Sequence, residues 1–568
     1  MLDEIARLKK ELKKKNKYGL VWEEKKEDVV EMCKEKLPVL IEDKSKAINE
    51  GEDGDPVNIL IEGDNYHALS ALSYTHEGKI DVIYIDPPYN TGAKDWKYNN
   101  DYVDSEDAFK HSKWICMMEK RIKLSKKLLK KNGALCCTID EYELFSLLGI
   151  FNELNSNILS IVSIVNKAEG RNQKKYFTGG IEYAVFVTWG SPEMRGLQVE
   201  EINFCDVCGK KISGKEQFKK DSKSKEFKWV GFHRRNPIQN PTSSNRWYPI
   251  YLNENGELSL DERENSIEIF PINKKGDKKI WGWKKDRLAK FLNKHKNDFK
   301  AEKYDLKDEV RYKILHKRYE VQRNKPKSYW IGSRYNAYSY GTKLIKEILE
   351  TADTLFEFPK SVKAVEDCID LFLPDDGIVL DFFAGSGTTG HASLELNKKD
   401  DGARRFILVT NNENNICQNV TYPRIKNVME GGYKIKNEII EALGGNLKFY
   451  KTDFVDAKQT DKNKKLLTEK ATDMLCIKED TYKEIKTKNK HFRIFASRNK
   501  YTAIIYDYME IDAFKEFIKK IDGKFNVYIF SLGDDAFEEE FEDLGNKVKL
   551  TPIPESIMRV YRRVFSNK

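Results

Sequence analysis

One short stretch constrains the fold more than any other: an apolar run that ends in a carboxylate, two prolines and an aromatic ring. Residues 81–85 are followed directly by Asp86, Pro87, Pro88 and Tyr89. Proline has no N–H for a sheet and fixes φ, so a buried strand must end here. Open α/β sheets carry their functional side chains at the carboxyl ends of strands, which makes this turn a candidate site. The alternative is an ordinary strand-end turn with a surface tyrosine.

The groups on this turn suit a planar base that carries an exocyclic amine. The carboxylate of Asp86 and the carbonyl of Pro87 can accept hydrogen bonds from the amine. The ring of Tyr89 can stack on the base. The four residues Asp86, Pro87, Pro88 and Tyr89 are therefore the candidate catalytic residues.

A second apolar strand, beginning at Ile378, leads into a glycine turn and the start of a helix. Glycines let a ligand approach the backbone, and a helix N-terminus favours polar or negative groups. The turn has the pattern Gly-x-Gly without the third glycine of the dinucleotide fingerprint. It indicates a nucleotide-like cofactor, bound by Asp381, Phe382, Phe383, Ala384, Gly385, Ser386, Gly387, Thr388 and Thr389.

Together the two motifs resemble those of the S-adenosylmethionine-dependent amino-methyltransferases of DNA. The catalytic motif comes first, an order similar to the β class, which includes the modification (Mod) subunits of Type III restriction–modification systems. The resemblance covers roughly residues 18–430. It implies a Rossmann-like α/β methyltransferase core that binds S-adenosylmethionine and methylates DNA after flipping a base out of the duplex.

The resemblance favours adenine N6 as the target, because Asp-Pro-Pro-Tyr usually accompanies adenine in the family and Ser-Pro-Pro-Tyr cytosine. Cytosine N4 is the alternative substrate. RNA and protein-glutamine methyltransferases are a weaker match, since they typically carry Asn-Pro-Pro-Tyr after the cofactor motif. A non-enzymatic DNA-binding subunit with a vestigial core is a third reading, and the intact Asp86, Tyr89, Gly385 and Gly387 argue against it.

The resemblance also implies cofactor contacts at the end of the strand before Asp64. An acid at this place lies near the adenine of the cofactor in the family, so Asp64 and the following Asn65 are candidates. Asp64 as the N-cap of a helix over 66–73 is the alternative. Asp86 is expected to face the cofactor as well as the target amine.

Two further segments of the cofactor half carry candidates. Lys360 and Ser361 stand where family members often have Lys-Pro, in a segment that reaches the methionine end of the cofactor. Ser361 can equally cap a helix over 362–373. Glu413 follows a strand over 404–410, where an acid commonly takes the ribose hydroxyls, and Glu395 is its rival.

Residues 190–325 change character, with weak periodicity and basic clusters that alternate with aromatic residues. In the family this location holds the target-recognition domain, and the alternative is a solvated, irregular insert. Lysine and arginine suit phosphates, while arginine and asparagine reach base edges. The predicted DNA contacts are Arg234, Arg235, Asn240, Arg246, Trp281 and Trp283. Cys205 and Cys208 form half of a zinc knuckle, but no second pair follows, so no metal is expected.

The 568 residues are too many for one simple core, and we expect several domains. These are an N-terminal helical arm over 1–50, the catalytic half over 51–189, the recognition domain over 190–325, the cofactor half over 326–430 and an α/β domain over 431–568. Within them we expect partly exposed helix over 18–50, a lid-like loop over 93–107 and a helix over 112–131 stopped by Asn132-Gly133.

Composition limits the class of protein. Charged residues make up 34% and apolar residues 40%, and no apolar run has membrane length, so a cytoplasmic protein without membrane contact is expected. The nine cysteines are scattered, which argues against a disulfide framework. The net charge of +9 permits binding to a polyanion such as double-stranded DNA.

A second copy of the chain is the expected protein partner, and a restriction (Res) subunit enters only if the system also cleaves DNA. Mod subunits, which the chain resembles, work as dimers, and an apolar stripe over 2–12 and a C-terminal domain without a visible site could bury surface against a second copy. The alternative is a monomer whose C-terminal domain packs on its own core. The sequence has no helicase P-loop and no nuclease carboxylate–lysine set, so cleavage would need a separate restriction (Res) subunit.

Overall fold

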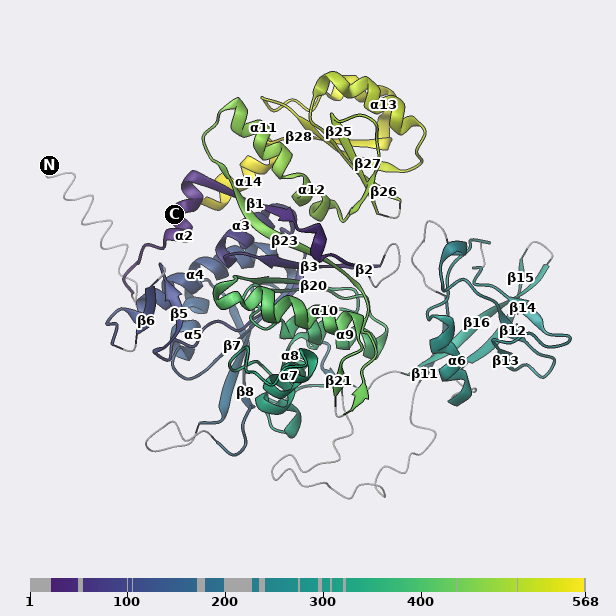
Figure 1. Cartoon of the computed structure of the whole chain (residues 1–568), viewed down its shortest axis with the longest axis horizontal. Helices are drawn as coiled ribbons and strands as arrows, with labels where there is room; N and C mark the ends of the chain where they lie inside the picture. The colour runs from purple at the N-terminus through teal and green to yellow at the C-terminus, as the bar shows by residue number, and fades with distance from the viewer. Residues whose placement is uncertain are drawn as a thin grey trace.

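The structure, a computed structural model, confirms the predicted α/β fold class (Figure 1). It describes residues 22–49, 55–99, 101–104, 106–170, 179–198, 227–233, 241–273, 276–294, 299–306, 309–319, 323–435, 437–497 and 499–565. In this part of the chain no helix is long and apolar enough to cross a membrane.

One 11-stranded sheet forms the centre of the molecule. Its strands from β23 through β7 run parallel, and β1, β9 and β8 add antiparallel pairs at the two sides. In spatial order the strands are β1 (Lys36–Glu42), β23 (Asn446–Asp456), β3 (Val57–Glu62), β20 (Arg405–Thr410), β19 (Ile378–Asp381), β4 (Ile80–Ile85), β7 (Leu129–Ile139), β9 (Ile181–Thr188), β8 (Asn157–Val165) and β18 (Tyr329–Trp330), with β2 (Ile48–Asn49) paired to β23.

Helices cover both faces of this sheet (Figure 1). Ile83 and Ile85 of β4 pack into one core cluster, and Val82 and Tyr84 pack into the other. A strand buried on both faces has a continuous apolar sequence, which is why residues 81–85 do not alternate. The covering helices include α3 (Asn65–Thr75), α4 (Lys110–Leu128) and α5 (Leu144–Glu153), and in the cofactor half α7 (Lys343–Ile348), α8 (Val362–Asp370), α9 (Thr388–Asp400) and α10 (Tyr422–Glu430).

The expected helix end at Asn132-Gly133 is wrong. α4 ends at Leu128, and β7 begins at Leu129, which pairs with Ile80 of β4. A Cβ at Gly133 would lie 2.8 Å from the carbonyl oxygen of Asp81, so this glycine permits close approach of two strands. The Asn-Gly pair therefore belongs to a strand and not to a helix cap.

Two other local predictions are corrected. Within residues 22–49, which the structure describes, the α-helical prediction holds only for α2 (Asp28–Glu35), because β1 and β2 enter the main sheet by pairing with β23. The segment over 93–107 forms a hairpin of β5 (Ala93–Tyr98) and β6 (Asp101–Asp104) in place of a loop. The apolar stripe over 2–12 lies outside the described residues.

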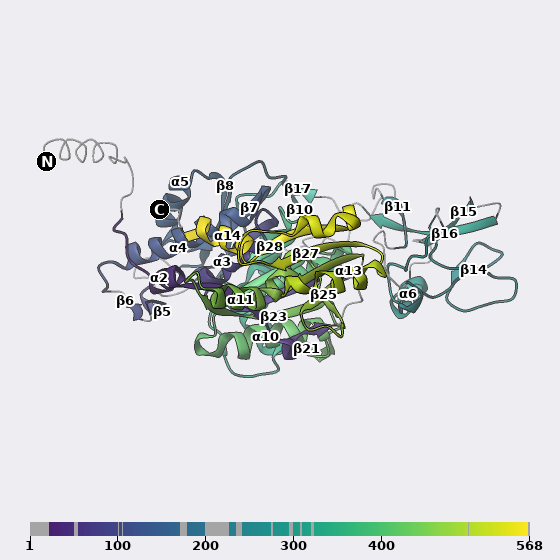
Figure 2. The same ribbon diagram turned by 90° about the horizontal axis from the view of Figure 1, so that it is seen from above.

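The expected recognition domain folds as a separate unit beside the core (Figures 1 and 2). The pairing of β10 (Leu197–Gln198) with β17 (Arg323–Asn324) brings its two connections together. The unit contains β11 (Phe227–Gly231), β12 (Ile250–Leu252), β13 (Leu258–Ser259), β14 (Ile267–Ile269), α6 (Lys285–Lys294), β15 (Phe299–Leu306) and β16 (Glu309–Tyr319). Its buried apolar residues form a cluster of their own, so the described part is not an irregular insert.

The boundary expected between residues 430 and 431 does not hold, because β23 lies between β1 and β3 in the main sheet. After β23 the chain forms a five-stranded sheet with the order β24 (Lys483–Ile485), β25 (Phe492–Ser497), β26 (Lys500–Ile505), β27 (Lys524–Phe530) and β28 (Val548–Ile553). Its helices are α11 (Asp461–Lys470), α12 (Thr472–Glu479), α13 (Ile511–Lys519) and α14 (Glu555–Phe565), while β21 (Lys434–Ile435) and β22 (Glu438–Ile439) form a small hairpin before β23.

The C-terminal unit packs on the core of its own chain. Ile557, Tyr561 and Val564 of α14 share one apolar cluster with Leu69 and Leu72 of α3. The Tyr561 hydroxyl donates a hydrogen bond to the carbonyl of Pro38 in β1. This packing matches the alternative to a dimer interface, in which the C-terminal domain packs on the core of its own chain.

Candidate active site

The two motifs meet because β4 and β19 are adjacent parallel strands. After β4 the chain continues to β7 on one side, and after β19 it continues to β20 on the other side. The boundary between β4 and β19 is therefore the topological switch point of the sheet. Asp86 follows the last residue of β4, and the glycine turn follows β19. Both turns open into one cavity of about 1980 Å³.

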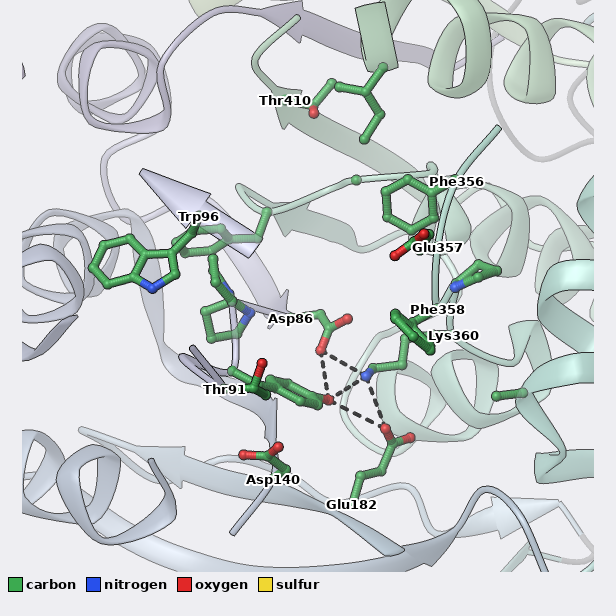
Figure 3. A pocket seen from close by; sticks show the side chains of 18 of the residues that line it. Asp86, Thr91, Trp96, Asp140, Glu182, Phe356, Glu357, Phe358, Lys360 and Thr410 are labelled. Carbon is green, nitrogen blue, oxygen red and sulfur yellow. Dashed lines mark hydrogen bonds and ion pairs between the residues drawn. The ribbon is translucent and has the colours of Figure 1, made fainter. Parts of the chain in front are cut away.

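Asp86 is held at one of its two oxygens. Its Oδ1 accepts hydrogen bonds from Thr138 Oγ1 at 2.8 Å and from the Tyr89 hydroxyl at 3.1 Å. Lys360 Nζ forms an ion pair with the same oxygen at 3.0 Å (Figure 3). Because these three contacts end on Oδ1, Oδ2 is the oxygen with capacity to accept from a ligand.

Glu182 completes this cluster. Its Oε2 lies 2.9 Å from Lys360 Nζ and 3.3 Å from the Tyr89 hydroxyl, and its side chain is only 5% exposed (Figure 3). Lys360 also donates to the Tyr89 hydroxyl and lies 4.5 Å from the centroid of that ring. One ammonium is therefore shared between two carboxylates at the catalytic turn.

Burial and charge perturb the cluster in opposite senses. Burial raises the pKa of the Asp86 carboxyl, and Lys360 opposes that shift. Burial disfavours the charge of Lys360, but Asp86 and Glu182 overcome it and raise the pKa of Lys360 above its ordinary value. Burial and the nearby carboxylates raise the pKa of Tyr89, so its ring remains a neutral phenol at physiological pH.

A buried network supports the catalytic turn from behind. Asn90 has a left-handed backbone with φ 58°, which asparagine tolerates better than most residues. Its side chain donates to Glu143 Oε1 at 2.5 Å and accepts from Trp96 Nε1 at 3.0 Å. Trp114 Nε1 donates to the carbonyl of Pro88 at 2.7 Å. These contacts fix the turn without touching Asp86.

The glycine turn is tied to its strand by Asp381. One oxygen of this buried carboxylate accepts from the backbone N–H of Phe383 at 2.9 Å, and the other accepts from Thr389 Oγ1 at 2.5 Å. Burial raises the pKa of Asp381 to about 7. Buried Arg424 donates through Nη1 to the carbonyl of Ser386 at 3.2 Å, so a guanidinium lies behind the turn.

Only part of this motif faces the cavity. Phe382, Phe383 and Gly385 line it. Gly385 has φ 48°, and an added Cβ there would lie 3.2 Å from Phe356 Cζ, so a side chain would fill the cradle. The remaining motif residues shape the turn from behind: Asp381, Ala384, Ser386, Gly387, Thr388 and Thr389.

Asp64 and Asn65 lie where both of their predicted roles can be met. Asp64 lines the cavity and also caps α3, accepting from the backbone N–H of Tyr66 at 2.8 Å. Asn65 lines the cavity and donates to the carbonyl of Phe382 at 3.0 Å. Arg121 lies 3.6 Å from Asp64 and donates to Asn65 Oδ1 at 2.5 Å, which holds the pair in place.

The candidate residues of the cofactor half differ in whether they line the cavity. Glu413 lines the cavity after β20, whereas its rival Glu395 lies on α9 at 3.5 Å from His391. Ser361 is buried and caps α8, accepting from the backbone N–H of Ala364 at 3.4 Å, so the capping alternative holds for it. Lys360 lines the cavity but contacts the catalytic turn.

Sequence reasoning missed Glu182 and Thr138. Glu182 belongs to β9, which begins at Ile181. β9 is antiparallel to β7, which places its first residues at the same sheet edge as the ends of the parallel strands. The sequence offers two signals for these residues. Glu182 is a polar residue near the start of an antiparallel strand, and Thr138 is a polar residue near the end of β7.

The predicted DNA contacts in the described part of the insert are not exposed. Trp281 is 1% exposed and Trp283 is 9% exposed, and both belong to the core cluster of this unit, so the prediction that they contact DNA is wrong. Arg246 is half-buried and donates to the carbonyl of Gly282 at 3.1 Å. Arg234, Arg235, Asn240, Cys205 and Cys208 lie outside the described residues. Among the residues that the structure describes, no cluster of metal-ligating side chains occurs.

Comparison with known proteins agrees with this geometry. A sequence profile of the DNA methylase family matches residues 80–422. The chain is 27% identical over 435 residues to the Type III restriction–modification enzyme EcoPI Mod subunit of Escherichia phage P1, covering 71% of this chain and 63% of that protein. It is 28% identical to the Type II methyltransferase M.KpnI of Klebsiella pneumoniae, covering 62% of this chain and 79% of that enzyme.

Among solved structures, the complex of M1.HpyAVI with SAM is similar at 14% identity and a TM-score of 0.28, covering 65% of this chain and 98% of that chain. The cytosine-N4-specific PvuII DNA methyltransferase is similar at 11% identity and a TM-score of 0.30, covering 63% of this chain and 84% of that chain.

Proposed function

The chain belongs to the DNA methylase family, and on that premise we propose that it transfers a methyl group from S-adenosylmethionine to N6 of adenine in duplex DNA. One observation carries the proposal: the carboxylate of Asp86 and the glycine turn at Gly385 open into the same cavity from adjacent strand ends. A cofactor and an amine can thus be held side by side. In the cell this activity is that of the modification subunit of a Type III-like restriction–modification system or of an orphan relative.

The residues present fit S-adenosylmethionine. The left-handed Gly385 leaves a cradle that a side chain would fill, and Phe382 and Phe383 supply apolar walls. Asp64 and Glu413 line the same cavity and can accept from the amine and hydroxyl groups of an adenosine. When bound, the cofactor supplies a methyl group on a cationic sulfur, which is already activated for transfer.

The residues of the chain then have to place the target amine. Asp86 Oδ2 accepts one N–H of the amine, which turns the nitrogen lone pair toward the cofactor side of the cavity. The Tyr89 ring stacks on the base, which returns about 1–3 kcal/mol against the few kcal/mol that flipping costs. Because Thr138 and Lys360 hold Oδ1, Asp86 is oriented before the substrate arrives, and catalysis by placement becomes effective.

The insert is the part that selects the DNA sequence. Trp281 and Trp283 are in its core, but Lys278, Lys284 and Lys285 are exposed and can contact phosphates. Exchanging residues 190–325 with the insert of a relative should move the methylated sequence and leave the chemistry unchanged. An unmoved sequence would assign recognition to another part of the chain.

Two alternatives differ in the methylated group: N4 of cytosine, and an amine of RNA or of a protein. Incubation with diverse duplex DNA, digestion and nucleoside mass spectrometry distinguish adenine from cytosine. Asp86→Ala should abolish turnover and leave the cofactor Kd nearly unchanged by titration calorimetry, because Asp86 serves the amine. A loss of cofactor affinity as large as the loss of rate would contradict that assignment.

We further propose a homodimer, in which a second copy holds DNA beside the active protomer, and a separate Res-type subunit for any cleavage. Light scattering of the full chain in about 0.3 M salt, which suppresses loose electrostatic association, should give twice the mass of one 66.3 kDa chain. The mass of one chain with full activity would contradict the dimer. Deleting residues 430–568 is not a usable control, because it removes β23 from the main sheet.

A further inference from the structure

The cluster at Asp86 holds a positive charge, that of Lys360, which methyl transfer alone does not explain. Lys360 Nζ lies 3.0 Å from Asp86 Oδ1, so the carboxylate that must serve the amine is already paired with a cation. A second carboxylate, Glu182, lies 2.9 Å from the same ammonium and is almost fully buried. Burying a carboxylate is costly unless it is paired, so its position has to be accounted for.

We propose that Glu182 is a positioning residue for methyl transfer: it holds Lys360 and offsets its charge, so that Asp86 presents net negative charge to the target amine. The inference rests on the proposed function. Glu182 acts through Lys360 and the Tyr89 hydroxyl, both of which it contacts, and not by touching the substrate.

Methyl transfer moves positive charge onto the target amine. The lone pair of the amine nitrogen forms the new N–C bond, and the electron pair of the broken S–C bond remains on sulfur. The nitrogen thereby becomes cationic until it releases one proton to solvent or to Asp86. A site that favours this step needs negative charge beside the nitrogen.

With Asp86 and Lys360 alone, the two charges would cancel, and the new cation would lie beside an ammonium. Adding Glu182 leaves two carboxylates and one ammonium, which is a net charge of one negative. Because all three groups are largely shielded from solvent, their mutual effect is stronger than on a surface. Lys360 can then orient Asp86 Oδ1 without repelling the amine from the cluster.

The geometry also explains why Asp86 alone cannot both offset the charge of Lys360 and accept a hydrogen bond from the amine. All the contacts that fix Asp86 end on Oδ1, and Oδ2 is needed for the amine. Glu182 comes from β9, and its Oε2 pairs with the same ammonium at 2.9 Å (Figure 3), so the offsetting charge comes from a carboxylate other than Asp86. The Tyr89 hydroxyl lies between the two carboxylates, at 3.1 Å from Asp86 and 3.3 Å from Glu182.

If Glu182 had only a structural role, its substitution would not change the pH dependence of the rate. That pH dependence therefore tests the proposal. Burial raises the pKa of Asp86, Lys360 lowers it, and the negative charge of Glu182 raises it further. Glu182→Gln should therefore shift the acid limb of kcat/KM to lower pH, and Lys360→Met should shift it to higher pH. Among the residues that the structure describes, the ionisable groups that interact electrostatically with Asp86 include Tyr84, Tyr89, Cys136, Cys137, Glu182, Lys360 and Asp381.

The test is a double-mutant cycle on the full chain with duplex DNA and S-adenosylmethionine. Glu182→Gln should lower kcat by about tenfold, a loss within the range of coupling found for residues in contact, with the cofactor Kd unchanged. In the Lys360→Met background the same substitution should cost little, because no ammonium remains to be offset. Equal losses in both backgrounds, or an unchanged kcat and acid limb in the single variant, would overturn the inference.

Glu366→Gln is the matched control. Glu366 is a buried glutamate on α8 that lies 2.6 Å from Lys363 and 3.4 Å from Lys399 and does not line the cavity. The substitution is the same and the burial similar, so this variant should keep the kcat and pH profile of the wild type.

A measurement without DNA separates this inference from the proposed function. Competitive acylation of the full chain with acetic anhydride, read by mass spectrometry, reports the pKa of Lys360. Glu182→Gln should increase labelling of Lys360 near neutral pH, and Glu366→Gln should not. Unchanged labelling overturns the Glu182–Lys360 coupling itself, whereas altered labelling in a chain that methylates no DNA overturns the proposed function.

Discussion

Replacing Thr138 with valine removes one donor from Asp86 and leaves the shape of the side chain almost unchanged. Thr138 Oγ1 lies 2.8 Å from Asp86 Oδ1 and is buried at the end of β7. The hydrogen bond favours the ionised carboxylate and lowers its pKa, against the rise that burial causes. Thr138→Val should therefore raise the pKa of Asp86 further.

The size of the effect can be worked from the contacts. A hydrogen bond to a charged group contributes about 1.5–3 kcal/mol, and one pKa unit corresponds to about 1.4 kcal/mol. Lys360 and Tyr89 remain on the same oxygen, so the lower end applies, which is about one pH unit. Asp86 serves the amine only when it is ionised, so the rate rises with pH through its pKa. The acid limb of kcat/KM should move about one unit to higher pH.

The assay is a pH series of kcat/KM for DNA methylation at saturating cofactor. Below the limb, Thr138→Val should be about tenfold slower than the wild type, and well above the limb the two should converge. Thr188→Val is the matched control: Thr188 is fully buried on β9 and donates to the carbonyl of Gly133 at 2.9 Å, at the opposite edge of the sheet. An acid limb that stays in place in Thr138→Val, or that moves equally in Thr188→Val, would refute the reasoning.

Three further predictions concern the cofactor turn and the insert. Arg424→Met should weaken S-adenosylmethionine binding about tenfold by calorimetry, because Ser386 loses a charged donor; an unchanged Kd would show that the turn holds its shape alone. Trp281→Ala should destroy hydrogen-exchange protection across the insert, because Trp281 is a core residue; intact protection would mean that the cluster tolerates the cavity. Reversing the charge of exposed Lys278 and Lys284 should reduce the salt dependence of DNA binding and leave that protection intact.

The two motif turns could be predicted because their signals are local. An apolar run that ends in prolines, or in a glycine pair before a helix, has few other structures open to it. Parallel strands then bring both ends to one edge of the sheet, which the order of the elements along the chain already suggests. The positions of Asp86, Tyr89 and Gly385 at the cavity follow from these rules.

The contact between Lys360 and Glu182 could not be predicted in this way. It depends on an antiparallel strand that enters the sheet beside β7 and on a loop that returns from the cofactor half. The place of β23 in the main sheet depends likewise on a distant pairing, with β3 in parallel and β1 in antiparallel register. Neither contact can be predicted from the sequence of one segment.

The tryptophans of the insert show a different limit. Lysines interleaved with tryptophans occur both on a surface that binds nucleic acid and in a small unit that buries its few large rings. Trp281 donates to the carbonyl of Tyr248 at 2.7 Å, and Trp283 donates to Asp401 at 2.8 Å. The rings are thus used for packing and anchoring, and the lysines remain at the surface.

The central claim, that Asp86 directs a methyl group to an amine of DNA, has one direct measurement. The wild-type chain and Asp86→Ala are each incubated with S-adenosylmethionine and duplex DNA of mixed sequence, and the digested nucleosides are separated by mass spectrometry. The expected product is N6-methyl-2′-deoxyadenosine from the wild type and none from the variant, with equal cofactor binding by both. N4-methylcytosine alone, no methylated base, or methylation that survives in Asp86→Ala would contradict it.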